Sequence, residues 1–185
     1  MKKKFGVKEV VAMGIGTALF VVLTNVQIPL VFVPNTALQP RMAVLAFFSA
    51  IFGPIVGGVV GFLGHALGDA LFYGSVWWSW VFPEAVVGVV IGLFASKYGV
   101  QEGKFTSTKT ITFFNVVQVI SNAVAWIVVA PVLDIIVYKE PSNKVFVQGA
   151  FAFLGNIIIM GILGSLLLVA YSEITGKSSN LKAEE

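Results

Sequence analysis

Three ionisable side chains stand inside stretches of the sequence that are otherwise almost wholly apolar. His65 and Asp69 are four residues apart, and Glu84 lies at the start of the next apolar stretch. A spacing of four places two residues on one face of a helix. An ionisable group in a membrane span costs about 2.5–3.5 kcal/mol near the bilayer centre, so such groups usually face a cavity or one another. These three residues are therefore candidates for ligand binding.

A second group of polar residues follows helical spacing in a later apolar stretch. Asn115, Gln118 and Asn122 recur at intervals of three and four, and Trp126 follows four residues on. These positions share one helical face, which we expect to line a cavity. The alternative is that the amides only form hydrogen bonds between helices, and that His65 and Asp69 are a local pair.

Amide, imidazole and carboxylate groups beside indole rings suit a neutral or weakly basic aromatic heterocycle. The polar groups match its ring heteroatoms, and indole covers its face. Three further tryptophans stand between the apolar stretches, and the last stretch adds Gln148 and an asparagine. The predicted substrate-binding residues are His65, Asp69, Trp77, Trp78, Glu84, Gln118, Asn122, Trp126 and Asn156.

The composition indicates which elements must position these side chains. Of 185 residues, 57% are hydrophobic and 11% are charged, whereas a soluble domain carries about 25% charged residues. A spanning helix needs about 20 apolar residues, so the chain has room for five or six spans and no soluble domain. We predict an all-α integral membrane protein forming a single membrane domain over residues 1–185.

Several kinds of chemistry find no support in the sequence. The chain has no cysteine and one histidine, which excludes thiol catalysis and offers too few ligands for a typical catalytic zinc site. No phosphate-binding G-x-x-x-x-G-K-[ST] loop occurs, so ATP-driven work needs another chain. We expect a protein that is not an enzyme, holds no cofactor or metal of its own and binds no nucleic acid.

The predicted spans depend on how the chain passes Gly53 and Pro54, which permit a reversal or a kink. A reversal gives six spans, and a kink gives five. Lys and Arg are enriched in short cytoplasmic loops, and the six-span arrangement places more of them inside, including Lys2, Lys3, Lys4, Lys8, Lys97, Lys104, Lys109, Lys177 and Lys182. Arg41, Lys139 and Lys144 then lie outside. The favoured arrangement has both termini cytoplasmic and spans at about 10–24, 36–52, 55–71, 82–97, 110–132 and 147–171.

The sequence also predicts the structure of the segments that flank these spans. The basic N-terminus followed by an apolar run is similar to a secretory signal, but no clear cleavage site follows, so we expect it to be the first span. Pro29, Pro34 and Pro40 predict a loop between the first two spans. We expect Trp77, Trp78 and Trp80 to form an interfacial aromatic cluster in an outer loop.

Small residues recur at helical spacing in two spans. Gly57, Gly61, Gly64 and Gly68 lie along one face of the third span and predict close packing of another helix. In the first span Ala12 pairs with Gly16, and Gly14 pairs with Ala18. This surface predicts either internal packing or the docking of a partner subunit.

Taken together, the chain resembles the substrate-binding S component of an energy-coupling factor (ECF) vitamin transporter. The resemblance rests on length, six short spans, the small-residue surface of the first span and the run RMAVLAFFSAIFGPIVGGVVGFLGHALGD from Arg41 to Asp69. In that family a helix rich in alanine and glycine is followed by Gly-Pro and a glycine-rich helix that ends in a polar residue.

The resemblance implies a multi-pass protein of a prokaryotic cell membrane that captures a vitamin or precursor from outside. Residues 25–41 and 72–80 would close over it, and Ala12, Gly14, Gly16 and Ala18 would dock on a transmembrane coupling (T) subunit. Two cytoplasmic ATPase subunits would complete the machine and use ATP. The loaded S component would then topple in the membrane.

The substrate remains open at this point. Within the family, the sequence is similar to a branch labelled riboflavin-like. The polar residues favour a smaller ring such as hydroxymethylpyrimidine, pyridoxine or a thiamine-related compound, and riboflavin is the alternative. Rivals from other classes are a stand-alone secondary transporter, which would normally show an internal repeat, and a membrane scaffold subunit without a ligand.

Overall fold

The computed structural model describes residues 6–33 and 35–183, with side chains described up to residue 177. Lys2, Lys3, Lys4, Pro34 and the side chain of Lys182 therefore lie outside the described part. The elements are α1 (Val7–Thr24), β1 (Ile28–Pro29), β2 (Ala37–Leu38), α2 (Arg41–Phe52), α3 (Pro54–Phe72), α4 (Trp78–Leu93), α5 (Ala95–Tyr98), α6 (Thr108–Asn122), η1 (Ala123–Val129), α7 (Ala130–Leu133), η2 (Asp134–Tyr138), α8 (Ser142–Ile159), η3 (Met160–Gly164) and α9 (Ser165–Ala183). The fold is all-α apart from one short hairpin.

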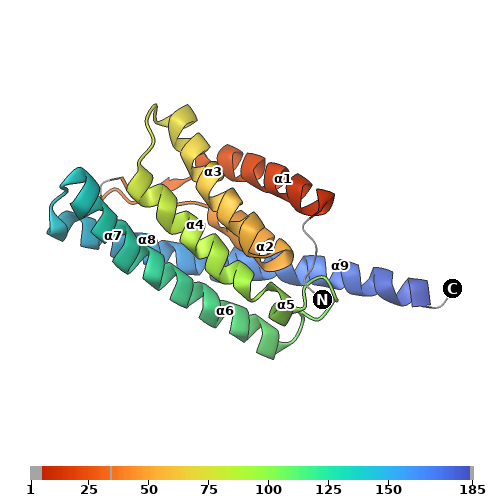
Figure 1. Cartoon of the computed structure of the whole chain (residues 1–185). Coiled ribbons are helices and arrows are strands. Elements are labelled where there is room, and N and C mark those ends of the chain that lie inside the picture. The colour runs from red at the N-terminus through yellow and green to blue at the C-terminus, as the bar shows by residue number, and fades with distance from the viewer. Residues whose placement is uncertain (1–5, 34, 184–185) are drawn as a thin grey trace.

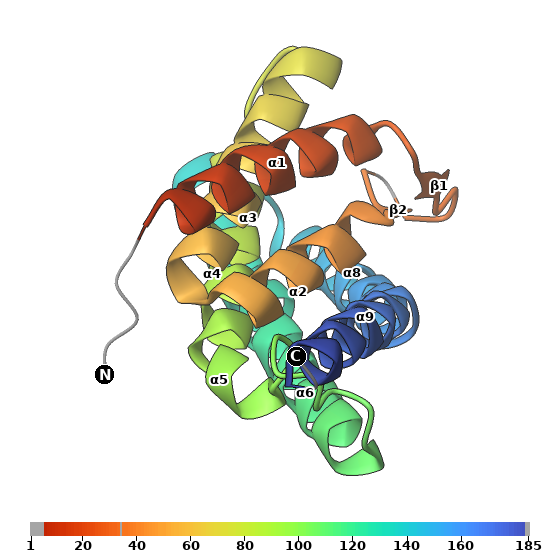
Figure 2. The same cartoon turned by 90° about the vertical axis from the view of Figure 1, so that its right-hand side faces the viewer.

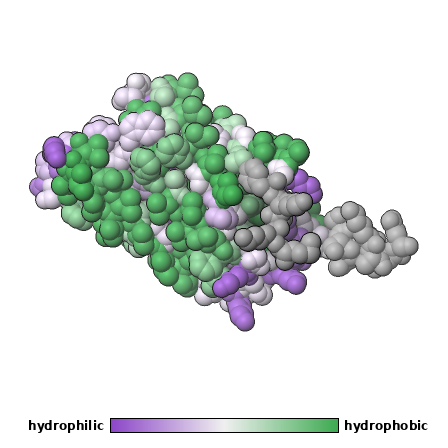
Figure 3. Space-filling view, viewed as in Figure 1, coloured by the Kyte–Doolittle hydropathy of each residue, from purple (hydrophilic) through white to green (hydrophobic). Residues whose placement is uncertain are grey.

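Four helical stretches in the described part are long and apolar enough to cross a membrane: 7–24, 54–72, 108–138 and 142–177. The last two are continuous helices in which π-helical segments alternate with α-helix. They run side by side along the bundle, and α9 continues past the other helices (Figure 1). Helices α2 and α4 are shorter and also apolar. The face seen in Figure 3 is largely hydrophobic, with the most hydrophilic residues gathered towards its left and lower edges.

Helix boundaries differ from the expected spans where proline and tryptophan occur. The second helix begins at Arg41 instead of residue 36, because Pro40 occupies the N-cap and residues 37–38 form a strand. Trp78 and Trp80 lie in the first turn of α4, not in a loop, because the helix begins directly after Trp77. The aromatic cluster therefore sits partly on regular helix.

The chain reverses direction between α2 and α3. Gly53 has φ of +94°, a conformation that residues with a side chain rarely adopt, and Pro54 opens the next helix. Arg41 at the start of α2 lies beside Glu84, which also contacts His65 near the end of α3. The start of α2 and the end of α3 thus lie together.

Glycines set the spacing of α3 from two neighbours. A methyl group on Gly61 would lie 2.6 Å from the carbonyl oxygen of Glu84 in α4. Farther along, one on Gly64 would lie 2.7 Å from the ring of Phe20 in α1, and one on Gly68 would lie 2.6 Å from Thr24 Oγ1. The glycine stripe therefore serves internal packing, first against α4 and then against α1. Helix α1 crosses one side of the bundle (Figure 2).

Candidate ligand-binding site

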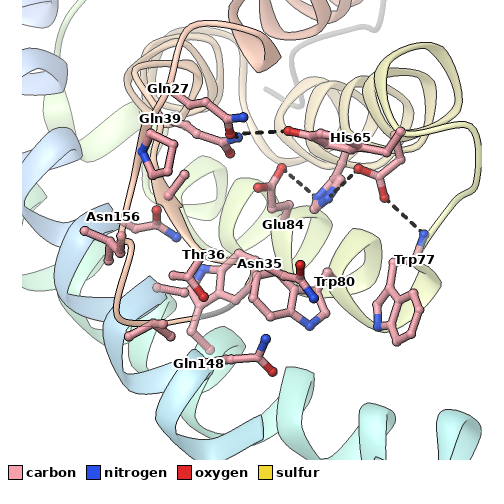
Figure 4. A pocket seen from close by; sticks show the side chains of 18 of the residues that line it. Gln27, Asn35, Thr36, Gln39, His65, Trp77, Trp80, Glu84, Gln148 and Asn156 are labelled. Atoms are coloured by element: carbon pink, nitrogen blue, oxygen red, sulfur yellow. Dashed lines mark hydrogen bonds and ion pairs between the residues drawn. The ribbon is translucent and has the colours of Figure 1, made fainter. Parts of the chain in front are cut away.

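A cavity of about 650 Å³ lies where the end of α3, the starts of α2 and α4, and the hairpin meet η1, η2 and α8. Drug-sized ligands typically occupy pockets of about 300–1,000 Å³. Polar and aromatic side chains from these elements converge on it (Figure 4). Its polar and aromatic lining comprises Gln27, Asn35, Thr36, Gln39, Arg41, His65, Asp69, Tyr73, Ser75, Trp77, Trp80, Glu84, Trp126, Asp134, Glu140, Lys144, Gln148 and Asn156.

Four charged or ionisable side chains form a continuous chain along one wall. Arg41 Nη2 lies 3.3 Å from Glu84 Oε1, and Glu84 Oε2 lies 3.2 Å from His65 Nδ1. His65 Nε2 in turn lies 3.3 Å from Asp69 Oδ1. All four residues are buried, so each charge depends on its neighbours for compensation.

Both ends of this row of four contacting side chains, the ionic chain, are bonded to further elements. Arg41 Nη1 donates to Thr24 Oγ1 over 3.1 Å, which reaches the end of α1. The backbone N–H of Trp77 donates to Asp69 Oδ2 over 3.0 Å, which fixes the turn between α3 and α4. This ionic chain thus connects the end of α1, the start of α2, the end of α3 and the first half of α4 around the cavity.

Trp77, Trp80 and Trp126 contribute aromatic rings to the lining. Trp80 meets Trp126 edge to face, with ring centroids 5.3 Å apart. Trp77 stacks on Tyr138 at 4.3 Å. The indole nitrogen of Trp126 is buried and has no hydrogen-bond partner within the described structure. Burial of a donor without a partner costs about 1–3 kcal/mol, and Trp126 itself lines the cavity.

The hairpin covers one side of the cavity. Ile28 pairs with Leu38 in an antiparallel register. The amide nitrogen of Gln39 donates to Gln27 Oε1 over 2.9 Å, and the hydroxyl of Tyr73 donates to the same oxygen over 3.2 Å. The hairpin and the turn after α3 are therefore joined through one side chain.

Comparison with known proteins identifies the kind of molecule that carries this cavity. The model of a family described as "ECF-type riboflavin transporter, S component" matches residues 4–173. The chain belongs to this family. S components are transporter subunits and not enzymes, so the protein is the substrate-binding subunit of an ECF transporter and a multi-pass membrane protein.

Close relatives carry names that state no substrate. The S component is 48% identical over 180 residues to a UPF0397 protein of Exiguobacterium sp. (strain ATCC BAA-1283 / AT1b), covering 97% of this chain and 98% of the relative. It is 49% identical over 180 residues to a UPF0397 protein of Streptococcus gordonii, covering 97% and 96%. A UPF0397 protein of Enterococcus faecalis is 42% identical over 184 residues, with 100% of both chains covered. No solved structure matches the chain significantly.

Six of the nine predicted substrate-binding residues line the cavity of this S component: His65, Asp69, Trp77, Glu84, Trp126 and Asn156. Gln118 and Asn122 do not line it. The Nε2 of Gln118 donates to the carbonyl of Ile157 over 3.3 Å, so this amide joins the two long helices. Asn122 donates to the backbone oxygen of Gln118 over 2.8 Å. Trp78 is 45% exposed and packs against Phe62 outside the cavity.

Other lining residues were missing from the predicted set, notably Arg41, Trp80, Asp134, Gln27, Gln39 and Gln148. The sequence indicated an outer loop position for Arg41 and a position at the membrane interface for Trp80, and both residues also line the cavity. Asp134 carried a usable signal, because it is a carboxylate near the end of a long apolar stretch.

The small residues of α1 in the S component divide between two faces. Ala12 and Gly16 are buried, and a methyl group on Gly16 would lie 2.7 Å from Val60. Gly14 and Ala18 are exposed, and nothing lies within 4 Å of the position of a methyl group on Gly14. One pair serves the fold, and the other lies on the outer surface.

Proposed function

We propose that this S component captures a small aromatic vitamin or precursor in the 650 Å³ cavity. The observation that carries the proposal is the meeting of a tryptophan wall with a buried ionic chain in one covered cavity. Indole rings hold a flat ring by its faces, while Asn156, Gln148 and the unpaired N–H of Trp126 offer groups for ring heteroatoms. Hydroxymethylpyrimidine, pyridoxine and thiamine-related compounds have this character.

Riboflavin is a second candidate, and two observations favour it. The matching family is described by riboflavin transport. The cavity is also larger than a single pyrimidine or pyridine ring requires.

Capture is tested by purifying the protein in detergent without added vitamin and identifying retained small molecules by mass spectrometry. Trp126→Phe keeps an aromatic ring but removes the unpaired donor, and Asp69→Asn removes one charge from the ionic chain. Asn122→Ala is the matched control, since Asn122 does not line the cavity. A vitamin retained by the parent and the control, and depleted from the folded site variants, supports capture and names the substrate.

Two outcomes would favour the rivals. If nothing co-purifies and a vitamin panel gives neither a thermal shift nor binding heat, the ligand-free scaffold replaces this proposal. Uptake of the solute by liposomes that contain this chain alone would instead support a stand-alone transporter.

For topology, we propose six spans with both termini cytoplasmic and the cavity towards the outer surface of the cell membrane. The short helices α2 and α4 then cross together with the four longer helical stretches. The chain has no cysteine, so single cysteines report accessibility without background. In cells, Lys144→Cys should react with an impermeant maleimide, whereas Lys97→Cys should react only after permeabilisation; the reverse pattern contradicts this topology.

For assembly, we propose that α1 docks on the T subunit and that two ATPase subunits bound to that partner use the ATP. Of the four expected docking residues, Gly14 and Ala18 occupy the exposed face and are assigned direct contact. Ala12 and Gly16 support the helix from within. The hairpin and the turn after α3 are assigned the opening and closing of the cavity.

A further inference from the structure

The carboxylate of Asp134 binds three donors from the start of α4. Its Oδ1 accepts the indole N–H of Trp77 over 2.7 Å and also contacts the hydroxyl of Ser79. Its Oδ2 accepts the indole N–H of Trp80 over 2.9 Å. Asp134 itself is only 2% exposed. One buried carboxylate therefore fixes both tryptophans that α4 and its N-cap contribute to the cavity.

These hydrogen bonds determine where the rings lie. Each indole is bonded to a different oxygen of one rigid carboxylate, and each also packs against another ring. Tyr138 stacks on Trp77 with an interplanar angle of 18°, and Trp126 meets Trp80 at 69°. A flat ligand thus meets aromatic surfaces with fixed orientation, which reduces the entropy lost on binding.

Asp134 has little capacity left for a ligand. An ionised carboxylate offers about four acceptor positions, and Trp77, Ser79 and Trp80 fill three of them. Its action on a bound ring therefore passes through the tryptophans, which makes it a positioning residue.

The same bonds affect the electron density of the rings. An N–H that donates to a carboxylate is polarised, and the negative charge lies at the edge of both indoles. Electron-rich indole faces attract cations. The charges of the whole lining also favour a cation, because its four carboxylates (Asp69, Glu84, Asp134, Glu140) outnumber its basic side chains, which are Arg41, Lys144 and His65.

We propose that Asp134 positions Trp77 and Trp80 as a stacking wall that selects positively charged aromatic rings over neutral ones. This rests on the proposed capture function and narrows its substrate class to rings with a permanent or acquired positive charge. Thiazolium, pyridinium and protonated aminopyrimidine rings belong to this class, and the uncharged flavin ring does not.

The test compares two probes by titration calorimetry in detergent: thiamine, which carries a thiazolium cation, and riboflavin, which is neutral. We expect the parent protein to bind thiamine about 10-fold more tightly, in line with a desolvated cation–π contact. Asp134→Asn should reduce that ratio at least about fivefold, because the amide lacks the charge and accepts through one oxygen only. Ser79→Ala leaves the charge and both indole bonds in place and should preserve the ratio.

A further variant guards against misfolding of Asp134→Asn. Trp80→Phe retains an aromatic ring without the N–H and should also narrow the ratio between the probes. Tryptophan emission and melting temperature establish that each variant is folded.

Three results overturn the proposal. The first is riboflavin binding to the parent as tightly as thiamine, and the second is an unchanged ratio in folded Asp134→Asn and Trp80→Phe. The third is failure of both probes to bind the parent. In each case the capture function is judged separately by the co-purified ligand, so a retained neutral compound removes charge selection and leaves capture standing.

Discussion

Arg41 and Glu84 lie 3.3 Å apart with side chains only 6% and 2% exposed. They are 43 residues apart in the chain and join the start of α2 to the start of α4. Both charged groups are buried away from water, so each is compensated chiefly by neighbouring charges and hydrogen bonds.

We expect Glu84→Gln to lower the free energy of unfolding by about 3–5 kcal/mol, because Arg41 then remains buried without its charged partner. Chemical denaturation in detergent measures the loss. Glu140→Gln is the control, since the Glu140–Lys144 pair is 21% and 38% exposed and such pairs contribute about 0–1 kcal/mol. Equal losses for the two variants would contradict this account.

Gly61→Ala should separate α3 from α4, because its methyl group would lie 2.6 Å from the backbone oxygen of Glu84. Overpacking of this kind costs about 1–3 kcal/mol, and displacement of Glu84 should also weaken ligand binding. Gly14→Ala is the matched control, with nothing within 4 Å of its methyl position. Melting temperatures check this prediction. A lower value for Gly61→Ala than for Gly14→Ala supports tight packing of α3 on α4, and equal values contradict it.

The two faces of α1 should respond differently to bulky residues. Ala18→Trp lies on the exposed face and should leave ligand binding unchanged while preventing co-purification with the T subunit. Gly16→Leu points inward at Val60 and should destabilise the isolated S component. Retained assembly in Ala18→Trp would remove the exposed face of α1 from the docking surface.

Trp126→Phe should weaken ligand binding about 5–15-fold, the equivalent of one hydrogen bond. Asn122→Ala should alter the melting temperature and leave the dissociation constant within about twofold, because Asn122 bonds the backbone of Gln118 behind the cavity. Titration calorimetry with the co-purified ligand compares the two. A larger loss of affinity in Asn122→Ala would extend the site into the pair of long helices.

Local sequence signals predicted much of the architecture. Lengths of apolar stretches gave the main helices, and Gly53–Pro54 marked a break where the chain reverses. The short α5, the two-residue strands and the start of α4 at Trp78 were missed. The strands have two residues each and α5 has four, which is too short for hydropathy or spacing to reveal. The first turn of α4 is bonded to Asp134, which is more than 50 residues away in the sequence.

The lining of the candidate site was predictable where the contacting residues are close in sequence. His65 and Asp69 were found because a spacing of four aligns them on one helix. The carboxylate of Asp134 was visible in the sequence, but its bonds to the tryptophans were not, because those partners lie 54 and 57 residues away on α4 and its N-cap. The stripe of Asn115, Gln118, Asn122 and Trp126 was ambiguous, because the same spacing suits residues that line a cavity and residues that join two helices. Of these four, Trp126 alone lines the cavity.

The exposed small-residue face at Gly14 and Ala18 has a consequence for assembly in a fluid bilayer. Before a partner helix arrives, acyl chains cover this face, and they are as apolar as the helix that replaces them. Docking is then an exchange of lipid for protein that releases chain entropy instead of burying surface from water. The stability of the proposed complex should accordingly change with the saturation and thickness of the surrounding lipids.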